Sequence, residues 1–257
     1  MTKCKNVLKT KNLGITFGGL KAVSGFNMEV CEKEIIGIIG PNGAGKTTVF
    51  NLLSGIYQPT EGNIYICGNL MNGKQSYEYV RQGVSRTFQN IRLFKNMTVI
   101  DNVKTAMHSH LTYSMYEAIL RKNNFYRLEQ EAEKRAANLL SLFNLVDKCN
   151  MAAGKLAYGE MRKLEIARAV VTGAKILLLD EPACGMNRTE RKELIECIKM
   201  IRDKYEIAVI LIEHDMNFVT ELCERIYVLD YGKIICSGVP RDVMHNKNVI
   251  AAYLGEE

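Results

Sequence analysis

A glycine-rich segment at residues 40–48 constrains the fold of this chain more than any other stretch. Its sequence, Gly-Pro-Asn-Gly-Ala-Gly-Lys-Thr-Thr, follows an apolar run at residues 35–39 and precedes a helical pattern that begins at Val49. A strand, a glycine-rich turn and a helix are the context in which the G-x-x-x-x-G-K-[ST] motif binds phosphate. The pattern therefore predicts a nucleoside triphosphate site in an α/β fold.

The residue types in this loop suit phosphate chemistry. Its glycines let the main chain turn so that successive N–H groups point into one concavity, and the N-terminus of the following helix adds further donors. Lys46 is expected to bridge the β- and γ-phosphates, and the Thr47 hydroxyl is expected to bind Mg²⁺. The residues predicted to hold the nucleotide are Gly40, Pro41, Asn42, Gly43, Ala44, Gly45, Lys46, Thr47 and Thr48.

Composition limits the class of protein. The chain has 257 residues, 47% of them hydrophobic, which allows one substantial core with an inserted subdomain. No apolar run approaches the roughly 18 residues of a membrane-spanning helix, and the lysine-rich first residues lack the apolar stretch of a secretory signal. A net charge of +6 without a long basic run gives little support to nucleic-acid binding. We expect a soluble, cytosolic protein.

Metal-ligand patterns are weak. The eight cysteines include no C-x-x-C pair, which argues against a zinc site or a redox dithiol. His108 and His110 alternate as metal ligands can, but no third ligand is close in the sequence. We expect both histidines to be solvated.

Short strands flank the phosphate loop. Residues 7–17 and 22–31 are predicted to form two strands joined by a Gly-Gly turn, and residues 62–67 form another short alternating strand. These strands predict an antiparallel β layer beside the nucleotide core. Phe17, at the end of the first strand, is a candidate for stacking on a base, with a position in the core as the alternative.

A helical insertion is predicted in the middle of the chain. Residues 85–100, which include Gln89, have no clean period, whereas residues 101–146 carry apolar side chains spaced three or four apart. This stretch lies between the phosphate loop and the later acidic residues. We therefore expect one domain over residues 1–257 with a helical subdomain inserted at about 91–160.

Another helical pattern begins at residues 156–160, which have the sequence Leu-Ala-Tyr-Gly-Glu. Gly159 lies just ahead of the apolar face of this predicted helix. It marks a candidate for a second phosphate-facing helix N-terminus.

Two later strands end in groups that suit catalysis. Residues 176–179 are entirely apolar and are followed by Asp180 and Glu181, and residues 207–212 are followed two positions later by His214. Continuous apolar runs are typical of parallel strands covered on both faces, and ligands bind at the carboxyl ends of such strands. Asp180 is expected to hold Mg²⁺ through water, and Glu181 is expected to position or deprotonate the attacking water.

The order of these motifs resembles the nucleotide-binding subunit of ABC transporters over essentially the whole chain. Within that family, it is most similar to the ATPases of branched-chain amino acid importers. The resemblance implies a P-loop NTPase core with a mostly parallel sheet, an antiparallel β layer and an inserted helical subdomain. The similar stretches are residues 17–23, 86–94, 156–160 and 164–169, and the ending Ala-Ala-Tyr-Leu-Gly.

The resemblance also implies a role for each motif. Phe17 would stack on the adenine of ATP, and Gln89 would contact Mg²⁺ or water and report to a membrane partner. Asp180 would serve Mg²⁺, Glu181 would polarise water, and His214 would contact the γ-phosphate. In a head-to-tail pair of chains, the signature of one chain would close over the ATP on the other chain's loop. The signature residues are Leu156, Ala157, Tyr158, Gly159 and Glu160.

The implied partners are integral membrane permease subunits and a second ATPase chain, either identical or a paralogue. A solute-binding protein would act indirectly. The chain would then be peripheral on the inner face of a bacterial membrane and would power uptake of leucine, isoleucine, valine or a related amino acid.

Two positions depart from the family pattern. Ala157 replaces the usual serine of the signature, so its hydroxyl contact is lost, although this change also occurs in the branched-chain importers. Asn187 stands where the loop after Glu181 usually has aspartate, and an amide cannot carry that charge. Communication between the two ATP sites is therefore expected to differ.

Alternative functions are the ATPase of a lipopolysaccharide or lipid exporter, and a soluble ABC-type regulator. The Ala-Tyr signature and the insertion at 101–135 favour the importer. A soluble regulator usually has two nucleotide modules or a long coiled coil, and this sequence has neither. A GTPase is disfavoured because no Asn-Lys-x-Asp guanine motif is present.

Overall fold

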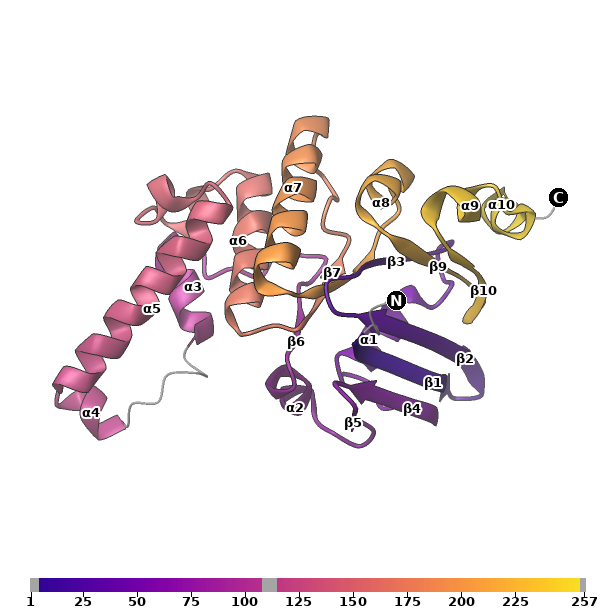
Figure 1. Cartoon of the computed structure of the whole chain (residues 1–257), viewed down its shortest axis with the longest axis horizontal. Helices are drawn as coiled ribbons and strands as arrows, with labels where there is room; N and C mark the ends of the chain where they lie inside the picture. The colour runs from indigo at the N-terminus through magenta and orange to yellow at the C-terminus, as the bar shows by residue number, and fades with distance from the viewer. Residues whose placement is uncertain (1–4, 108–114, 255–257) are drawn as a thin grey trace. The chain divides into compact units, whose positions relative to one another are not determined.

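The computed structural model describes residues 5–107 and 115–254, and the chain divides into two compact units (Figure 1). The first unit comprises Met1–Gln89 and Ala174–Glu257, and the second is Asn90–Gly173. The second unit contains the stretch predicted as an insertion at about 91–160 and continues to the end of the helix that follows the signature. His108 and His110, predicted to be solvated, lie outside the described residues.

The first unit contains a six-stranded sheet in the order β10-β9-β3-β8-β7-β6. The pairs β6–β7, β7–β8, β8–β3 and β3–β9 are parallel, and β10 pairs with β9 in the antiparallel direction. The predicted, mostly parallel sheet is therefore confirmed. The strands are β3 (Ile35–Ile39), β6 (Val84–Arg86), β7 (Ile176–Asp180), β8 (Ala208–Ile212), β9 (Arg225–Asp230) and β10 (Lys233–Gly238).

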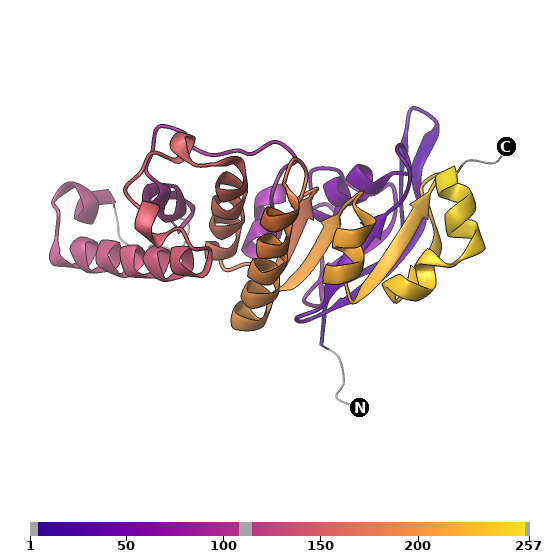
Figure 2. The ribbon, with the colours of Figure 1, turned by 90° about the horizontal axis from the view of Figure 1, so that it is seen from above.

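The three central strands are apolar, apart from Asp180 at the end of β7, because both faces of the sheet are covered. Every residue of β3, β7 and β8 is buried. Alternate side chains, such as Ile36, Leu178 and Ile210, join one core cluster with Phe50 and Leu53 of helix α1 (Lys46–Leu53). On the opposite face, α7 (Arg188–Tyr205) and α8 (Met216–Leu222) lie side by side (Figure 2).

A four-stranded antiparallel sheet, in the order β2-β1-β4-β5, forms the second β layer of this unit. Val23 and Phe26 of β2 are buried in the same core cluster as the central sheet, so the predicted antiparallel layer is confirmed. The short helix α2 (Ser76–Arg81) was not predicted. The strands are β1 (Asn6–Phe17), β2 (Leu20–Cys31), β4 (Glu61–Ile66) and β5 (Asn69–Leu70).

The second unit is helical in its described part. Its helices α3, α5 and α6 pack together through buried side chains such as Val103, Leu139 and Leu164. The helices are α3 (Val99–Met107), α4 (Met115–Ile119), α5 (Asn123–Leu142) and α6 (Tyr158–Val171), with single 3₁₀ turns at Val146–Lys148 and Ala153–Lys155.

The last helices, α9 (Pro240–Met244) and α10 (Lys247–Leu254), belong to the first unit.

Across residues 5–107 and 115–254, no helix has the length and apolar character needed to cross a membrane.

Candidate nucleotide site

The glycine-rich loop connects the end of β3 to the start of α1. Gly40 and Gly45 have φ angles of +149° and +98°, which side chains rarely tolerate. A Cβ atom on Gly40 would lie 2.1 Å from the carbonyl oxygen of Leu229, and a Cβ atom on Gly45 would lie 2.8 Å from that of Ala22. The close approach of two neighbouring strands thus leaves room only for glycine at both positions.

Lys46 is buried at the first position of α1, and its ammonium group lies over the loop. The Nζ atom donates to the carbonyl oxygens of Gly40 at 2.7 Å and Pro41 at 2.9 Å. Burial lowers the pKa of Lys46, while the Glu181 carboxylate opposes this shift. The first turn of α1 contains no acidic side chain that would compete with a bound anion. The loop therefore offers a positively charged amine and unopposed helix N–H groups to phosphate oxygens.

Two predicted residues from separate parts of the chain, Gln89 and His214, meet at Glu181. His214 Nε2 lies 2.7 Å from one oxygen of the Glu181 carboxylate, and Gln89 Nε2 donates to the other at 2.9 Å. The Glu181 N–H donates to the Ile212 carbonyl at 2.9 Å, which ties the end of β7 to β8. Glu181 has a φ of +46°, an uncommon conformation for a side-chain-bearing residue. The chain thus holds one carboxylate at the sheet edge with both oxygens engaged.

A second glutamate, Glu213, supports this cluster and was not among the predicted site residues. It is 4% exposed, and its carboxylate accepts the N–H groups of Ala183 at 2.7 Å and His214 at 3.1 Å. Burial raises the pKa of Glu213. Its position in the sequence, directly after the apolar run of β8, could have indicated it. Glu213 joins the segment after β7 to the segment after β8.

Asp180 forms a buried ion pair with Arg86, which was not among the predicted site residues. Arg86 Nη2 lies 2.9 Å from Asp180 Oδ2, and the two side chains are 9% and 10% exposed. Arg86 Nη1 also donates to Asn51 at 2.7 Å and to Ser54 at 3.2 Å. The guanidinium lies over the rings of Phe50 and Phe88. Arg86 therefore fixes the orientation of the carboxylate that was predicted to serve Mg²⁺.

Replacing Arg86 with methionine is expected to lower the free energy of unfolding by about 3–5 kcal/mol, because Asp180 would become a buried charge without its partner. The measurement is urea unfolding followed by circular dichroism. Arg81→Met is the matched control, because Arg81 is exposed on α2, and its loss should change the free energy of unfolding by less than about 0.5 kcal/mol. Equal effects of the two substitutions would contradict a structural role for the Arg86–Asp180 pair.

Phe17 is 43% exposed at the end of β1, so its alternative position in the core is wrong. Its ring meets Tyr57 edge to face, with the ring centroids 5.2 Å apart. Tyr57 was not predicted as part of the site. The stacking of Phe17 on adenine stays a prediction.

The signature residues lie at the start of α6 in the second unit. Leu156 and Gly159 are buried, whereas Tyr158 is 45% exposed. Ala157 stands at the N-cap position and offers no side-chain acceptor. The Glu160 carboxylate instead accepts the Ala157 N–H at 3.2 Å and pairs with Lys148. The donors available at this helix end are therefore main-chain N–H groups.

The C-terminal helix α10 also contacts the phosphate loop, which the sequence had not indicated. Tyr253 of this helix lies beside Gly40, and burial raises the pKa of Tyr253 to about 12. A cavity of about 890 Å³ separates Pro41 and the residues after it from Asn248 and Ala251 of α10. The last helix thus forms one wall beside the loop.

Comparisons with known families agree with this arrangement. Residues 23–184 match the family described as ABC transporter, and residues 233–257 match the family described as branched-chain amino acid ATP-binding cassette transporter. The chain is 45% identical over 250 residues to the high-affinity branched-chain amino acid transport ATP-binding protein BraF of Pseudomonas aeruginosa, covering 97% of this chain and 98% of that protein. LivG of Escherichia coli strain K12, which carries the same description, is similar to the same extent.

A more distant relative is the lipopolysaccharide export system ATP-binding protein LptB of Haemophilus influenzae. It is 30% identical over 252 residues, which cover 98% of each chain. Among solved structures, the ADP conformation of an ATP-binding cassette of an ABC transporter has a TM-score of 0.84 and 29% identity, covering 98% of this chain and 99% of that one.

Proposed function

The chain belongs to the ABC transporter family of ATP-binding subunits, and we propose that it hydrolyses ATP to drive an importer of branched-chain amino acids. The ATPase assignment rests on one observation. Gln89, Glu181 and His214 contact one another at the sheet edge where β3 ends and the phosphate loop begins. In this proposal, the chain is one ATP-binding domain that consists of the antiparallel layer, the central sheet and the helical insertion.

ATP would be held by the loop at residues 40–48. Its N–H groups and the α1 N-terminus would bind the phosphates, and Lys46 would exchange its bonds to the loop carbonyls for bonds to the β- and γ-phosphates. Phe17 would cover the adenine ring, and its edge-to-face contact with Tyr57 supports that position. The carbonyl groups of Gly40 and Pro41 would then accept hydrogen bonds from water or from the second ATPase chain.

The oxygen donors near the loop fit Mg²⁺, which prefers hard oxygen ligands. Thr47 offers a hydroxyl, Gln89 an amide oxygen and Asp180 a carboxylate. Arg86 engages Oδ2 of Asp180 and leaves Oδ1 available for a metal-bound water. Bound Mg²⁺ would neutralise phosphate charge during hydrolysis.

Glu181 would polarise the attacking water as a general base. Its two carboxylate oxygens contact Gln89 and His214, and these contacts orient the base. His214 would move from Glu181 towards the γ-phosphate when the site closes. The main-chain donors near Gly159 of a second chain would complete the site, which predicts a head-to-tail pair of identical or paralogous ATPases.

The importer assignment rests on two observations. Identity to the branched-chain amino acid transport proteins is 45%, against 30% to the lipopolysaccharide export protein. The segment 233–257 also matches the branched-chain family. We therefore propose that the chain binds membrane permeases at the inner face of a bacterial membrane. The alternative function is lipopolysaccharide or lipid export.

We expect leucine to act only through partner subunits. Leucine should leave the ATPase rate of the isolated chain unchanged and should raise it several-fold when permeases and a leucine-loaded binding protein are present, because an effect requires differential contact with the closed state. The measurement is phosphate release from proteoliposomes, with an unrelated amino acid as the control. Stimulation by lipopolysaccharide instead of leucine would favour the exporter, and calorimetric binding of leucine to the isolated chain would contradict the proposal.

A further inference from the structure

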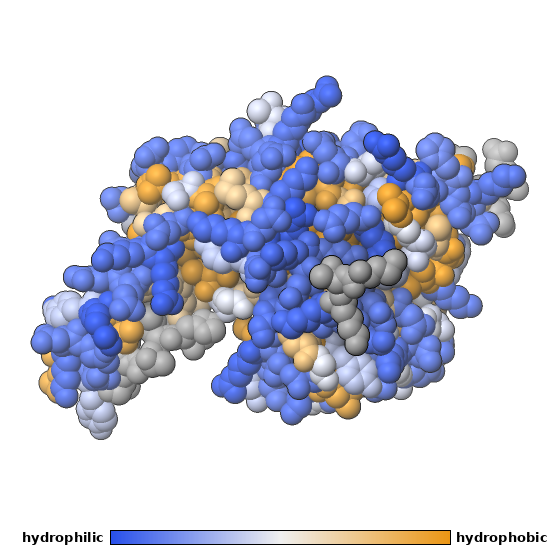
Figure 3. Space-filling model, viewed as in Figure 1, coloured by the Kyte–Doolittle hydropathy of each residue, from blue (hydrophilic) through white to orange (hydrophobic). Residues whose placement is uncertain are grey.

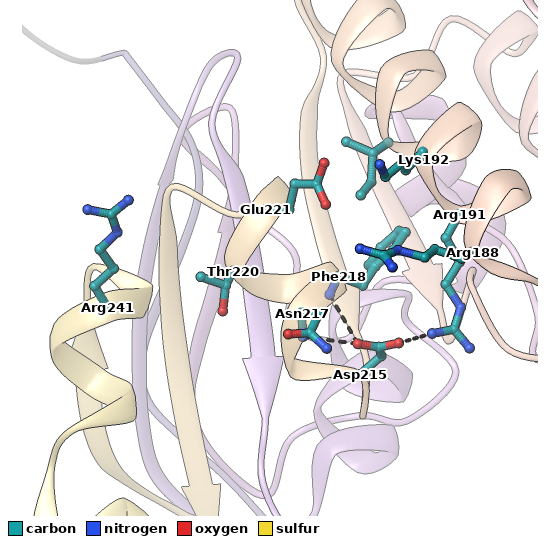
Figure 4. A pocket seen from close by; sticks show the side chains of 10 residues that line it. Arg188, Arg191, Lys192, Asp215, Asn217, Phe218, Thr220, Glu221 and Arg241 are labelled. Carbon is teal, nitrogen blue, oxygen red and sulfur yellow. Dashed lines mark hydrogen bonds and ion pairs between the residues drawn. The ribbon is translucent and has the colours of Figure 1, made fainter.

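A cationic cavity lies between α7, α8 and α9, away from the phosphate loop. Its volume is about 820 Å³, within the range of small-molecule sites. Figure 4 shows its side chains, with Arg188 of α7 beside Phe218 near the start of α8 and Lys192 of α7 on the side of Glu221. The charged lining residues are Arg188, Arg191, Lys192, Asp215, Glu221 and Arg241, so cations outnumber carboxylates.

The Asp215 carboxylate is already committed to other groups. Its Oδ1 accepts the N–H groups of Asn217 at 3.0 Å and Phe218 at 3.1 Å, and its Oδ2 pairs with Arg191. Asp215 therefore neutralises Arg191 and caps α8, but it does not compensate the other cations.

The remaining cations are unpaired in the part of the chain that the structure describes. Neither Arg188, Lys192 nor Arg241 has an ion-pair or side-chain hydrogen-bond partner there, and Glu221 is the one carboxylate left on the cavity wall. Hydrophilic side chains surround α7 on the surface seen in Figure 3. Ile195 and Phe218, both buried, form an apolar floor.

We propose that this cavity binds a small phosphate-bearing anion at a site separate from the phosphate loop. Arginine forks match phosphate oxygens in two parallel hydrogen bonds, and lysine adds a mobile point charge. The cavity can hold a ligand of nucleotide size, and its excess positive charge favours at least two anionic groups. Pyrophosphate and the phosphates of a free nucleotide share this chemistry.

The position of Arg191 connects the cavity with the proposed ATPase site. Its Nε donates to the Met186 carbonyl at 3.0 Å, and its guanidinium pairs with Asp215, the residue after His214. A bound phosphate would compete with Asp215 for Arg191 and so loosen the segment that holds His214 against Glu181. The ligand should lower kcat and leave the KM for ATP unchanged. This effect on turnover rests on the proposed function, whereas binding itself does not.

The binding test is titration calorimetry of the chain and its variants in a Lys46→Ala background, which removes the ammonium group expected to hold phosphates at the loop. We expect pyrophosphate to bind the wild-type chain, and the triple variant Arg188→Gln/Lys192→Gln/Arg241→Gln to bind it at least tenfold more weakly, since the loss of even one charge-assisted hydrogen bond weakens binding by about that factor. Adenosine 3′,5′-bisphosphate is the second probe. Tighter binding of it than of pyrophosphate assigns a nucleotide as the source of the phosphates, and equal or weaker binding assigns an inorganic anion.

The matched control removes the same number of charges outside the cavity, with Lys199→Gln, Lys204→Gln and Lys233→Gln. This variant should bind pyrophosphate with wild-type affinity, which separates the site from a general effect of net charge. Equal weakening in both triple variants would overturn the proposal, as would loss of the pyrophosphate signal when Lys46→Ala is introduced alone. Circular dichroism of both variants establishes that they are folded, and the calorimetry stands even if the chain shows no ATPase activity.

Discussion

Glu181→Gln should bind ATP as well as the unmodified chain does and lose turnover by about 10²–10⁴-fold, the usual contribution of a general base. The amide cannot take a proton or polarise water as a carboxylate does. It keeps the shape of the side chain and one oxygen acceptor, so contacts to Gln89 or His214 can persist. Because ATP is no longer consumed, it should hold two chains together. Phosphate release and gel filtration with ATP and Mg²⁺ measure the two effects.

Glu213→Gln is the control for this prediction. Glu213 is close in the chain to His214, but its carboxylate accepts main-chain N–H groups and is not placed to polarise the attacking water. An amide keeps one of the two acceptor oxygens and loses the other, so we expect a loss of turnover of about tenfold, the size of one hydrogen bond. A Glu181→Gln variant that stays monomeric and still hydrolyses ATP would refute the assignment of Glu181 as the base.

The central part of the site was predictable because burial leaves a strong pattern. Strands β3, β7 and β8 are covered on both faces, so their sequences are continuous apolar runs whose ends are easy to locate. Parallel pairing then brings the residues after each strand to one edge. The contact between Glu181 and His214 follows from this parallel pairing, and no pattern in the residues around either one indicates it.

Other features could not be predicted because they depend on distant contacts. The strand β6 has only three residues, Val84–Arg86, too few for a period to be seen. Its Arg86 pairs with Asp180, 94 residues further along the chain. Similarly, the cavity that residues 41–44 share with α10 brings the end of the chain to the loop near its beginning. Neither pairing leaves a trace in local composition or spacing.

The start of α6 suggests a way for a signature without a serine hydroxyl to bind phosphate, as we propose. Ala157 has no side-chain donor, so binding would depend on the main-chain N–H groups near Gly159 and on the positive end of the helix dipole. Glu160 places a carboxylate beside this end, but its ion pair with Lys148 offsets that charge. Introducing the serine hydroxyl should therefore add little, and we expect Ala157→Ser to be tolerated.

Gly159→Asp should stop ATP turnover in the assembled transporter, with a loss of at least about 10²-fold, comparable to the removal of one donor from a preorganised anion site. The new carboxylate would stand against the γ-phosphate at a buried position. Gly159→Asn is the matched control, because it has the same shape without the charge and should retain more activity. Phosphate release from proteoliposomes measures turnover, and thermal unfolding establishes that both variants fold. Tyr158→Phe then separates two roles of the exposed tyrosine: a large loss assigns its hydroxyl to the site, and near-normal activity assigns packing against the partner. Full ATPase activity in Gly159→Asp would show that the helix end does not face phosphate.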